Sequence, residues 1–149
     1  MLYDLYQRAH SQIESVLSNP QFDKFSLLDW QQPFSERSNE IRIDYAGWSN
    51  EPIFAGEEDY EIAQNKKAHT LTIFIRFYKQ KNQEDIYFLV EEIEKKMVKE
   101  NFTALNDSEK TIGQVFILSA DEDHNLIETQ EGGGTIQLGV QFTIYDNNL

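Results

Sequence analysis

The sequence predicts an α+β fold: a single mixed or antiparallel β-sheet with two α-helices packed on one face and a long acidic loop. Two stretches, 70–78 and 135–145, alternate between apolar and polar residues, and the stretch between them, 83–100, repeats its apolar residues every three or four positions. Alternation places one side of a strand in a core, and the longer period places one stripe of a helix there. The two strands therefore have an apolar side that needs a cover, and the helix between them supplies it.

The most regular alternation lies near the carboxyl end, from Thr135 to Tyr145. Every second side chain is apolar: Ile136, Leu138, Val140, Phe142 and Ile144. The residues between them are Gln137, Gly139, Gln141, Thr143 and Tyr145. We expect a strand with one buried face and one face largely in water.

The best partner for this strand, judged by pattern, is the stretch 70–78. Its apolar positions are Leu71, Ile73, Ile75 and Phe77. Its other face carries Phe74 and Tyr78 beside polar side chains, so that face is only half polar. We therefore expect the two strands to lie next to each other in the sheet.

Two segments have the spacing of amphipathic helices. The first runs from residue 2 and ends before Pro20; its apolar positions are Leu2, Leu5, Tyr6, Ala9, Ile13 and Val16 or Leu17. The second, at 83–100, follows Asn82, whose side chain suits an N-cap. Its apolar stripe is Ile86, Leu89, Val90, Ile93 and Met97. We expect both helices to cover the same face of the sheet.

Charged pairs are expected on the exposed side of the helix at 83–100. Glu91 stands four residues before Lys95, and Glu92 stands four residues before Lys96. Side chains four residues apart are neighbours on a helix surface, so each glutamate is predicted to pair with its lysine.

The first half of the chain also contains less regular segments. Residues 19–40 scatter aromatic and aliphatic side chains among polar residues and two prolines, which is typical of a packed connector with a short helical turn. A strand is expected at 41–45, broken by Gly47-Trp-Ser-Asn, with a short return at Ile53-Phe54. Residues 56–65 are the most acidic part of the chain, and we expect a long loop or hairpin tip that becomes ordered only against a neighbour.

A hairpin is expected before the last strand. Its first strand spans 111–120, with either Val115 and Ile117 or Phe116 and Leu118 in the core. Residues 121–125 are predicted to turn the chain, 125–129 to return as a short strand, and the three glycines at 132–134 to lead into the last strand. Helix, strand, loop, strand, helix and hairpin in this order favour an α+β class.

Length and composition limit the function. A chain of 149 residues fits one domain, here 1–149, with a core of ordinary size. The formal charge of −13 disfavours specific binding of DNA or RNA, because phosphate backbones are repelled. Without cysteine there are no disulfides or thiolate metal sites. We expect no signal peptide and no membrane span.

None of the familiar catalytic or metal-binding patterns is complete. Asp121-x-Asp123-x-Asn125 matches the start of a calcium loop, but Leu126 stands where glycine is required and Gly132 where glutamate is required. The three histidines have no ligand spacing, no Gly-x-Ser-x-Gly turn is present, and the triple glycine is not followed by Gly-Lys-Ser/Thr. We therefore predict no catalytic residue, no metal site, no cofactor and no enzyme activity.

The order of these elements resembles the tail terminator (tail completion) proteins of tailed bacteriophages. The resemblance is carried by the amino-terminal helix, the acidic loop, the strand Lys67 to Tyr78, the amphipathic helix after it, and the closing Gly133 to Tyr145 strand. It spans most of the chain, is clearest from 67 to 149, and is weakest from 19 to 66. The family shares a pattern rather than an invariant motif, so no catalytic residue is carried over.

The resemblance implies a structural protein of the virion, in its tail or neck, assembled in the cytoplasm of a bacterial host. Subunits of this family close into a ring, typically a hexamer. The ring sits on the last ring of the tail tube, stops its growth, and presents a surface to the head–tail connector. The expected partners are therefore other copies of this chain, the tail tube protein and the connector protein.

The acidic composition suggests how such a ring passes DNA. Six chains of formal charge −13 carry −78 together. An acidic lumen lets DNA slide without sticking, because like charges repel. By charge density, the candidates for the lumen or an axial rim are Glu57, Glu58, Asp59 and Glu61. Candidates for subunit contacts, as aromatic residues outside the predicted core faces, are Trp48, Phe54, Tyr60 and Phe74.

Two other classes of function stay open at this point. One is a monomeric or dimeric ligand-binding α+β domain, in which the aromatic segment Phe22 to Phe34 lines a pocket. The other is a hydrolase with carboxylate chemistry. Carboxylate pairs are so abundant in this chain that the sequence cannot single out an acid/base couple. A concentration-dependent ring favours assembly, whereas a melting shift induced by a small molecule favours the pocket.

Overall fold

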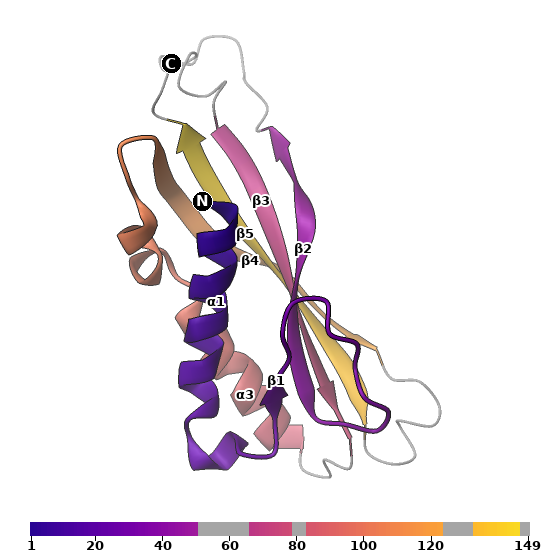
Figure 1. Ribbon diagram of the computed structural model, residues 1–149. Coiled ribbons are helices and arrows are strands. Elements are labelled where there is room, and N and C mark those ends of the chain that lie inside the picture. Colours follow the sequence, from indigo (N-terminus) through magenta and orange to yellow (C-terminus); the bar gives the residue numbers. More distant parts are fainter. Residues whose placement is uncertain (51–65, 79–82, 124–132, 147–149) are drawn as a thin grey trace.

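The computed structural model describes residues 1–50, 66–78, 83–123 and 133–146. These residues form one five-stranded sheet, in the order β1-β2-β3-β5-β4, with the helices α1 and α3 packed against it (Figure 1). The predicted α+β fold is confirmed. The acidic stretch 56–65, the return at 53–54 and the strand at 125–129 lie outside the described residues.

The sheet is mixed, with four long antiparallel strands and one short parallel one. The long strands are β2 (Glu40–Asn50), β3 (Lys66–Phe77), β4 (Lys110–Asp123) and β5 (Gly134–Asp146). The short strand β1 (Ser26–Leu27) pairs in parallel with the first two residues of β2. As predicted, β3 and β5 are neighbours, with Ile73 opposite Leu138.

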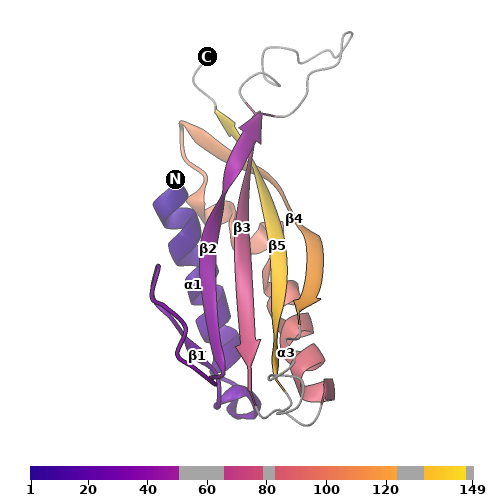
Figure 2. The ribbon, with the colours of Figure 1, turned by 90° about the vertical axis from the view of Figure 1, so that its right-hand side faces the viewer.

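Both helices cover one face of this sheet and leave the other open. α1 (Leu2–Leu17) and α3 (Gln83–Lys96) lie behind the sheet in Figure 2, where the viewer looks onto the open face. We call these the covered face and the uncovered face. α1 ends before Pro20, as predicted, and the short 3₁₀ turn Pro20–Phe22 begins the connector to β1.

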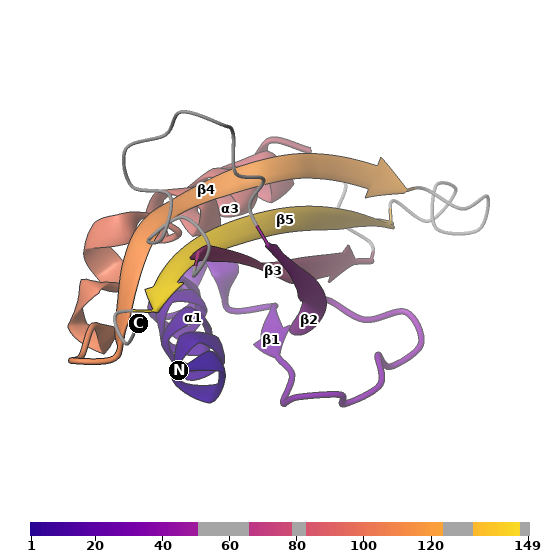
Figure 3. The same cartoon turned by 90° about the horizontal axis from the view of Figure 1, so that it is seen from above.

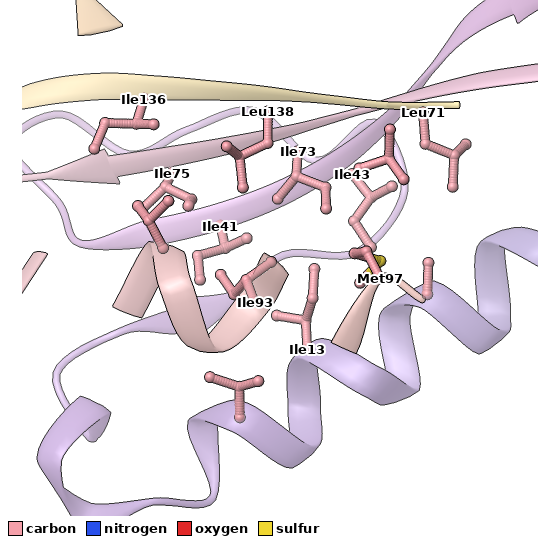
Figure 4. Packing of buried hydrophobic residues seen from close by; sticks show 14 of the residues in the cluster. Ile13, Ile41, Ile43, Leu71, Ile73, Ile75, Ile93, Met97, Ile136 and Leu138 are labelled. Atoms are coloured by element: carbon pink, nitrogen blue, oxygen red, sulfur yellow. The ribbon is translucent and has the colours of Figure 1, made fainter. Parts of the chain in front are cut away.

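The core fills the space between the covered face and the two helices. Ile13 of α1, Ile93 of α3 and Met97 just after α3 point toward the isoleucines and leucines of β2, β3 and β5 (Figure 4). All five alternating apolar residues of β5 are buried, as is the predicted stripe of α3. Each aliphatic side chain buried in this way contributes about 1.5–3 kcal/mol, so the predicted core accounts for the layered architecture.

Aromatic packing closes the core where β4 begins. The rings of Phe102 and Phe142 meet edge to face, with centroids 4.8 Å apart and planes at 70°. Phe102 lies in the segment after α3. The helix was predicted to continue to residue 100. α3 instead ends at Lys96, and the Asn101 side chain donates to the Lys96 carbonyl oxygen at 2.8 Å. That hydrogen bond satisfies one of the unpaired carbonyls at the end of the helix and leads the chain into 3₁₀ turns.

Two strands continue past their predicted ends. A break in β2 was predicted at Gly47, but the strand continues through it, because a bulge between Tyr45 and Gly47 absorbs the irregularity. Gly47 has φ +109°, a conformation that favours glycine. β4 runs to Asp123, so residues 121–123 belong to a strand and the predicted turn there was wrong. At both places the prediction relied on residues that are common in turns, whereas pairing with a neighbouring strand keeps the chain extended.

Smaller predictions on the helix surfaces also need correction. Lys95 pairs with Glu92, three residues before it, with Nζ and Oε1 2.9 Å apart. The predicted partner was Glu91, so the spacing chosen was one residue too long. Leu2, assigned to the buried stripe of the first helix, is exposed because it lies at the end of α1, beyond the main cluster of core residues.

Candidate functional site: the uncovered face and the edges of the sheet

The uncovered face carries mostly hydroxyl and amide side chains. By strand alternation these are Thr70, Thr72, Ser119, Thr135, Gln137 and Gln141. The charged side chains described on this face are Arg42, Lys66 and Arg76 against Glu40, Asp44 and Asp121. These formal charges balance, although the whole chain carries −13. The uncovered face is therefore a surface on which two copies can approach with little repulsion.

Arg42 organises one corner of this face. Its Nε and Nη2 donate to the two carboxylate oxygens of Asp44 at 2.8 and 2.9 Å, and its Nη1 donates to the Gln32 carbonyl oxygen at 3.2 Å. The guanidinium carbon lies 4.5 Å from the centre of the Phe34 ring and 5.6 Å from that of Phe74. Phe74, a candidate for subunit contacts, is thus half-buried by contacts within its own chain.

The aromatic segment Phe22 to Phe34 does not gather around one pocket. Phe22 is buried in the core, with its ring centroid 5.6 Å from that of Phe88 in α3. Phe25 packs against the core, Phe34 lies against Arg42, and Trp30 is exposed. Most of these aromatic side chains therefore pack the connector against the rest of the subunit. They do not line one common pocket, as the ligand-binding alternative would require.

Both tryptophans of the chain are exposed, Trp48 on β2 and Trp30 beside it. Trp48 has 54% of its surface accessible, and the Lys67 ammonium lies 4.3 Å from its ring centre. Trp30 is 62% accessible and borders the same hollow as Arg42, Asp44 and Tyr45 of β2. Trp48 was a predicted contact residue; its side chain is exposed, and the contact itself stays a prediction. Trp30 was missed because it lies in a segment that the sequence analysis treated as a unit.

A second exposed apolar area lies on β4. Phe116 is 38% and Leu118 is 49% accessible, while Val115 and Ile117 pack against the core. This decides which alternate pair of this strand faces the helices. Beside it runs a groove between α3 and β4, lined by Glu91, Glu94, Lys95, Met97, Val98, Val115, Phe116 and Ile117. The sequence indicates this exposed area through the apolar run Val115-Phe-Ile-Leu, because a strand with apolar residues on both sides leaves one apolar side outside the core.

A hollow of about 280 Å³ lies at the amino-terminal end of α1, between Met1, Leu2, Lys67, His69, Lys110, Ile144 and Asp146. Two contacts fix lining residues of this hollow: the His69 Nδ1 lies 3.0 Å from the Tyr45 hydroxyl, and the Lys110 ammonium forms an ion pair with Asp146 at 3.1 Å. Burial, with smaller effects from Lys67 and Lys110, lowers the pKa of His69. Burial also raises the pKa of the Tyr45 hydroxyl, so both groups are neutral at pH 7.

The histidines and carboxylates of the described part of the chain do not form a cluster of metal ligands. No group of three or more histidine and carboxylate side chains there could hold a metal ion. His10 pairs with Glu14 within α1 and His69 with Tyr45 between strands, while His124 lies outside the described residues. None of the described helices is long and apolar enough to cross a membrane.

The remaining predicted site residues fall outside the described ranges. They are Phe54, Glu57, Glu58, Asp59, Tyr60 and Glu61. Their expected places at a lumen, a rim or a subunit contact stay predictions. What the structure does bring together is an uncovered sheet face with balanced charge, flanked by two edges with exposed aromatic or aliphatic side chains.

Comparison with known proteins gives a structural match only. No family model matches the chain. No curated protein matches it in sequence. Among solved structures, the chain is similar to a chain of the virion of a native gene transfer agent (GTA) particle, with a TM-score of 0.55. The match covers 92% of this chain and 91% of that chain at 10% identity, so what the two share is the fold.

Proposed function

We propose that the chain is a structural protein of a virion, and within the virion a ring-forming tail terminator. The observation that carries the proposal is that its fold agrees, over nine-tenths of both chains, with that of a virion chain. The resemblance of the element order to tail terminators supports the finer assignment. The exposed edges and uncovered face support a function in assembly, because a protein that works through its surfaces needs such areas and no enclosed site.

In this proposal the ring caps the last ring of the tail tube and joins the tube to the head–tail connector. A ring made of one kind of subunit uses two different surfaces on each copy, because head-to-tail contacts are heterologous. The two sheet edges supply two such surfaces on opposite sides of the subunit. The ends of the long strands are then left for the tube below and the connector above.

The lumen is proposed to be passive toward DNA. The candidates Glu57, Glu58, Asp59 and Glu61 would line it or its rim, where their charge repels the phosphate backbone. The test is a variant in which all four are changed to lysine. We expect its rings to retain DNA at low salt and to release it as salt rises, whereas wild-type rings retain none. Rings of the variant that also retain none would contradict the placement.

The tail-capping function is tested with assembled tail tubes from the same particle. We expect the purified chain to sediment with the tubes in amounts that follow the number of tube ends, and electron microscopy to show added density at one end. Capped tubes should stop elongating when more tube protein is added. Binding along the whole tube wall, or tubes that elongate at the normal rate in excess protein, would contradict a terminator.

A further inference from the structure

The sheet ends in two free edges within the described residues. β1 pairs only with Glu40 and Ile41, and the Leu28 amide donates to the Ile41 carbonyl oxygen at 2.8 Å, so the connector closes only the start of β2. From Ile43 to Asn50, the described strands pair with β2 on the β3 side alone. β4 is the last strand on the opposite side (Figure 3). Free edges present rows of N–H and C=O groups that readily accept another strand.

The strand directions allow one edge to accept the other. β2, β3, β5 and β4 are antiparallel in turn, so β2 and β4 of one chain run in opposite directions. A second copy placed alongside in the same orientation therefore brings its β2 antiparallel to β4 of the first. Antiparallel pairing is the more stable kind, and the helices of both copies stay on the same face.

The residues that flank the two edges suit burial. Four of the seven large apolar side chains that are exposed in the described residues lie there: Trp30 and Trp48 beside β2, and Phe116 and Leu118 on β4. Tryptophan and phenylalanine are enriched in the buried centres of protein interfaces, and tryptophan dominates their energetic hot spots. The free part of β2 is roughly 27 Å long at about 3.4 Å per residue, enough for a strand pairing of ordinary length.

The rows of the sheet show which side chains would meet. Trp48 stands in one row with His69, Phe142 and Val115. That row ends on the covered side of β4, at the groove where Met97 and Val98 lie beside Val115. If the next copy continues the row without a shift along the strands, its Trp48 enters this groove.

The charges around this contact are complementary. The Lys67 ammonium lies 4.3 Å from the Trp48 ring centre, so it would face the partner copy together with that ring. The groove that receives the ring carries the carboxylates of Glu91 and Glu94, and the lysine in its lining, Lys95, is already paired with Glu92 at 2.9 Å. The Lys67 ammonium of one copy and these two carboxylates of the next would therefore attract each other across the edge-to-edge contact.

We infer that copies of this chain join head to tail through these edges, with residues 43–50 of β2 in one copy lying antiparallel beside β4 of the next. The sheet would then continue from subunit to subunit around the ring. The inference rests on the proposed ring and deepens it by naming the two surfaces that form each contact.

Cysteine cross-linking tests the inference directly, because the natural chain has no cysteine. Ser49 and Gln114 are both exposed and stand in one row, through Ala68 and Thr143. Within one copy the strands β3 and β5 separate them. Across the proposed contact they would be neighbours, with Cα atoms about 4.5–5.5 Å apart, which suits a disulfide.

The experiment oxidises the double variant Ser49→Cys/Gln114→Cys mildly, both free in solution and bound to tail tubes. We expect a ladder of covalent species in steps of 17.5 kDa that ends at the closed ring. Each single variant has a thiol on only one side of the contact and is expected to stay monomeric. Adding Phe116→Lys and Leu118→Lys to the double variant should abolish the ladder, whereas adding Tyr3→Ala, an exposed change on α1, should leave it intact.

The outcomes separate this inference from the proposed function. Efficient dimers of a single variant would show that like edges meet, and would overturn it. A double variant that caps tubes yet forms no ladder would overturn the inference and leave the terminator function standing. A ladder from protein that binds no tube end would support the edge contact and contradict the terminator function. Circular dichroism of each variant shows that a lost ladder does not come from unfolding.

Discussion

The two faces of β5 differ as strongly as any two regions of this molecule. On the covered face, Leu138, Val140 and Phe142 have no accessible surface. On the uncovered face, Gln137, Gly139 and Gln141 alternate with them and stay half-exposed. One face therefore holds the subunit together, while the other is free to meet something else.

This difference shows which residues can change the surface used in assembly without lowering the stability of the subunit. Changes on the covered face remove buried apolar contacts and destabilise the subunit itself. Changes at exposed positions of the uncovered face and the edges leave the core intact, so their effects should appear in assembly more than in the free energy of unfolding, except where that face is locally packed, as at Gly113 and Arg42. The following predictions test that separation, beginning with the largest expected effect.

The largest effect should come from opening a cavity on the covered face. Leu138→Ala removes a fully buried side chain that lies opposite Ile73 in the middle of the sheet. We expect the free energy of unfolding to fall by about 2–5 kcal/mol in urea titrations. Gln137→Ala, one residue away on the uncovered face, should change it by less than about 0.5 kcal/mol. Equal losses would mean that the two faces are not separated as described.

A smaller loss is expected where the uncovered face is locally tight. A Cβ at Gly113 would lie 2.3 Å from the Tyr145 ring and 2.9 Å from the Thr143 hydroxyl, which accepts a hydrogen bond from the Gln114 amide. Gly113→Ala should therefore destabilise the chain by about 1–3 kcal/mol. In Gly139→Ala the nearest atom to the added Cβ is the Ser119 hydroxyl oxygen, at 3.2 Å, and Leu118 Cβ follows at 3.7 Å, so this change should cost less in the same titration. The reverse order would contradict this packing.

The corner built on Arg42 should contribute about 1 kcal/mol, from a partly exposed ion pair and a cation–π contact. Arg42→Ala removes the paired hydrogen bonds to Asp44 and the contact with Phe34. Arg42→Lys keeps the charge but not the planar fork, so it should recover only part of the loss. Thermal melts of the three proteins give the comparison, and full recovery by lysine would show that charge alone matters.

The smallest effect concerns pH. Burial lowers the pKa of His69 below its ordinary 6.5, so below pH 6.5 the unfolded chain binds a proton more readily than the folded one. The stability that this difference contributes is present above pH 6.5 and is lost as the pH falls below it. His69→Gln removes this loss. Lowering the pH from 7 to 5.5 should therefore reduce the unfolding free energy of the wild type more than that of the variant, so the gap between the two changes. A gap that stays constant would show that burial does not disfavour the charged imidazole.

Periodicity predicted those parts of the fold that are long and regular. The covered face of β5, the stripe of α3 and the pairing of β3 with β5 follow from alternating or helical spacing, because burial imposes that spacing on the sequence. The two-residue strand β1 is too short to show a period. The strand through Gly47 and the strand end at Asp121–Asp123 were missed because residues common in turns were tolerated there by a bulge and by pairing with β5.

The candidate surfaces were predicted less completely than the fold. Trp48 was expected at a contact and is exposed, whereas Phe74, predicted on the same grounds, lies against Arg42 of its own chain. Sequence shows which side of a strand a residue occupies but not which loop folds over it. Trp30, Phe116 and Leu118 became candidates only when the order of strands placed them at the two edges.

Hydrogen–deuterium exchange of the chain, free and bound to tail tubes, tests most directly whether the uncovered parts of the sheet carry the function. The account predicts that assembly slows exchange in residues 43–50 of β2 and 114–118 of β4, while the exposed sides of α1 and α3 exchange as in the free chain. Protection confined to the two helices, with both strand edges unchanged, would contradict it.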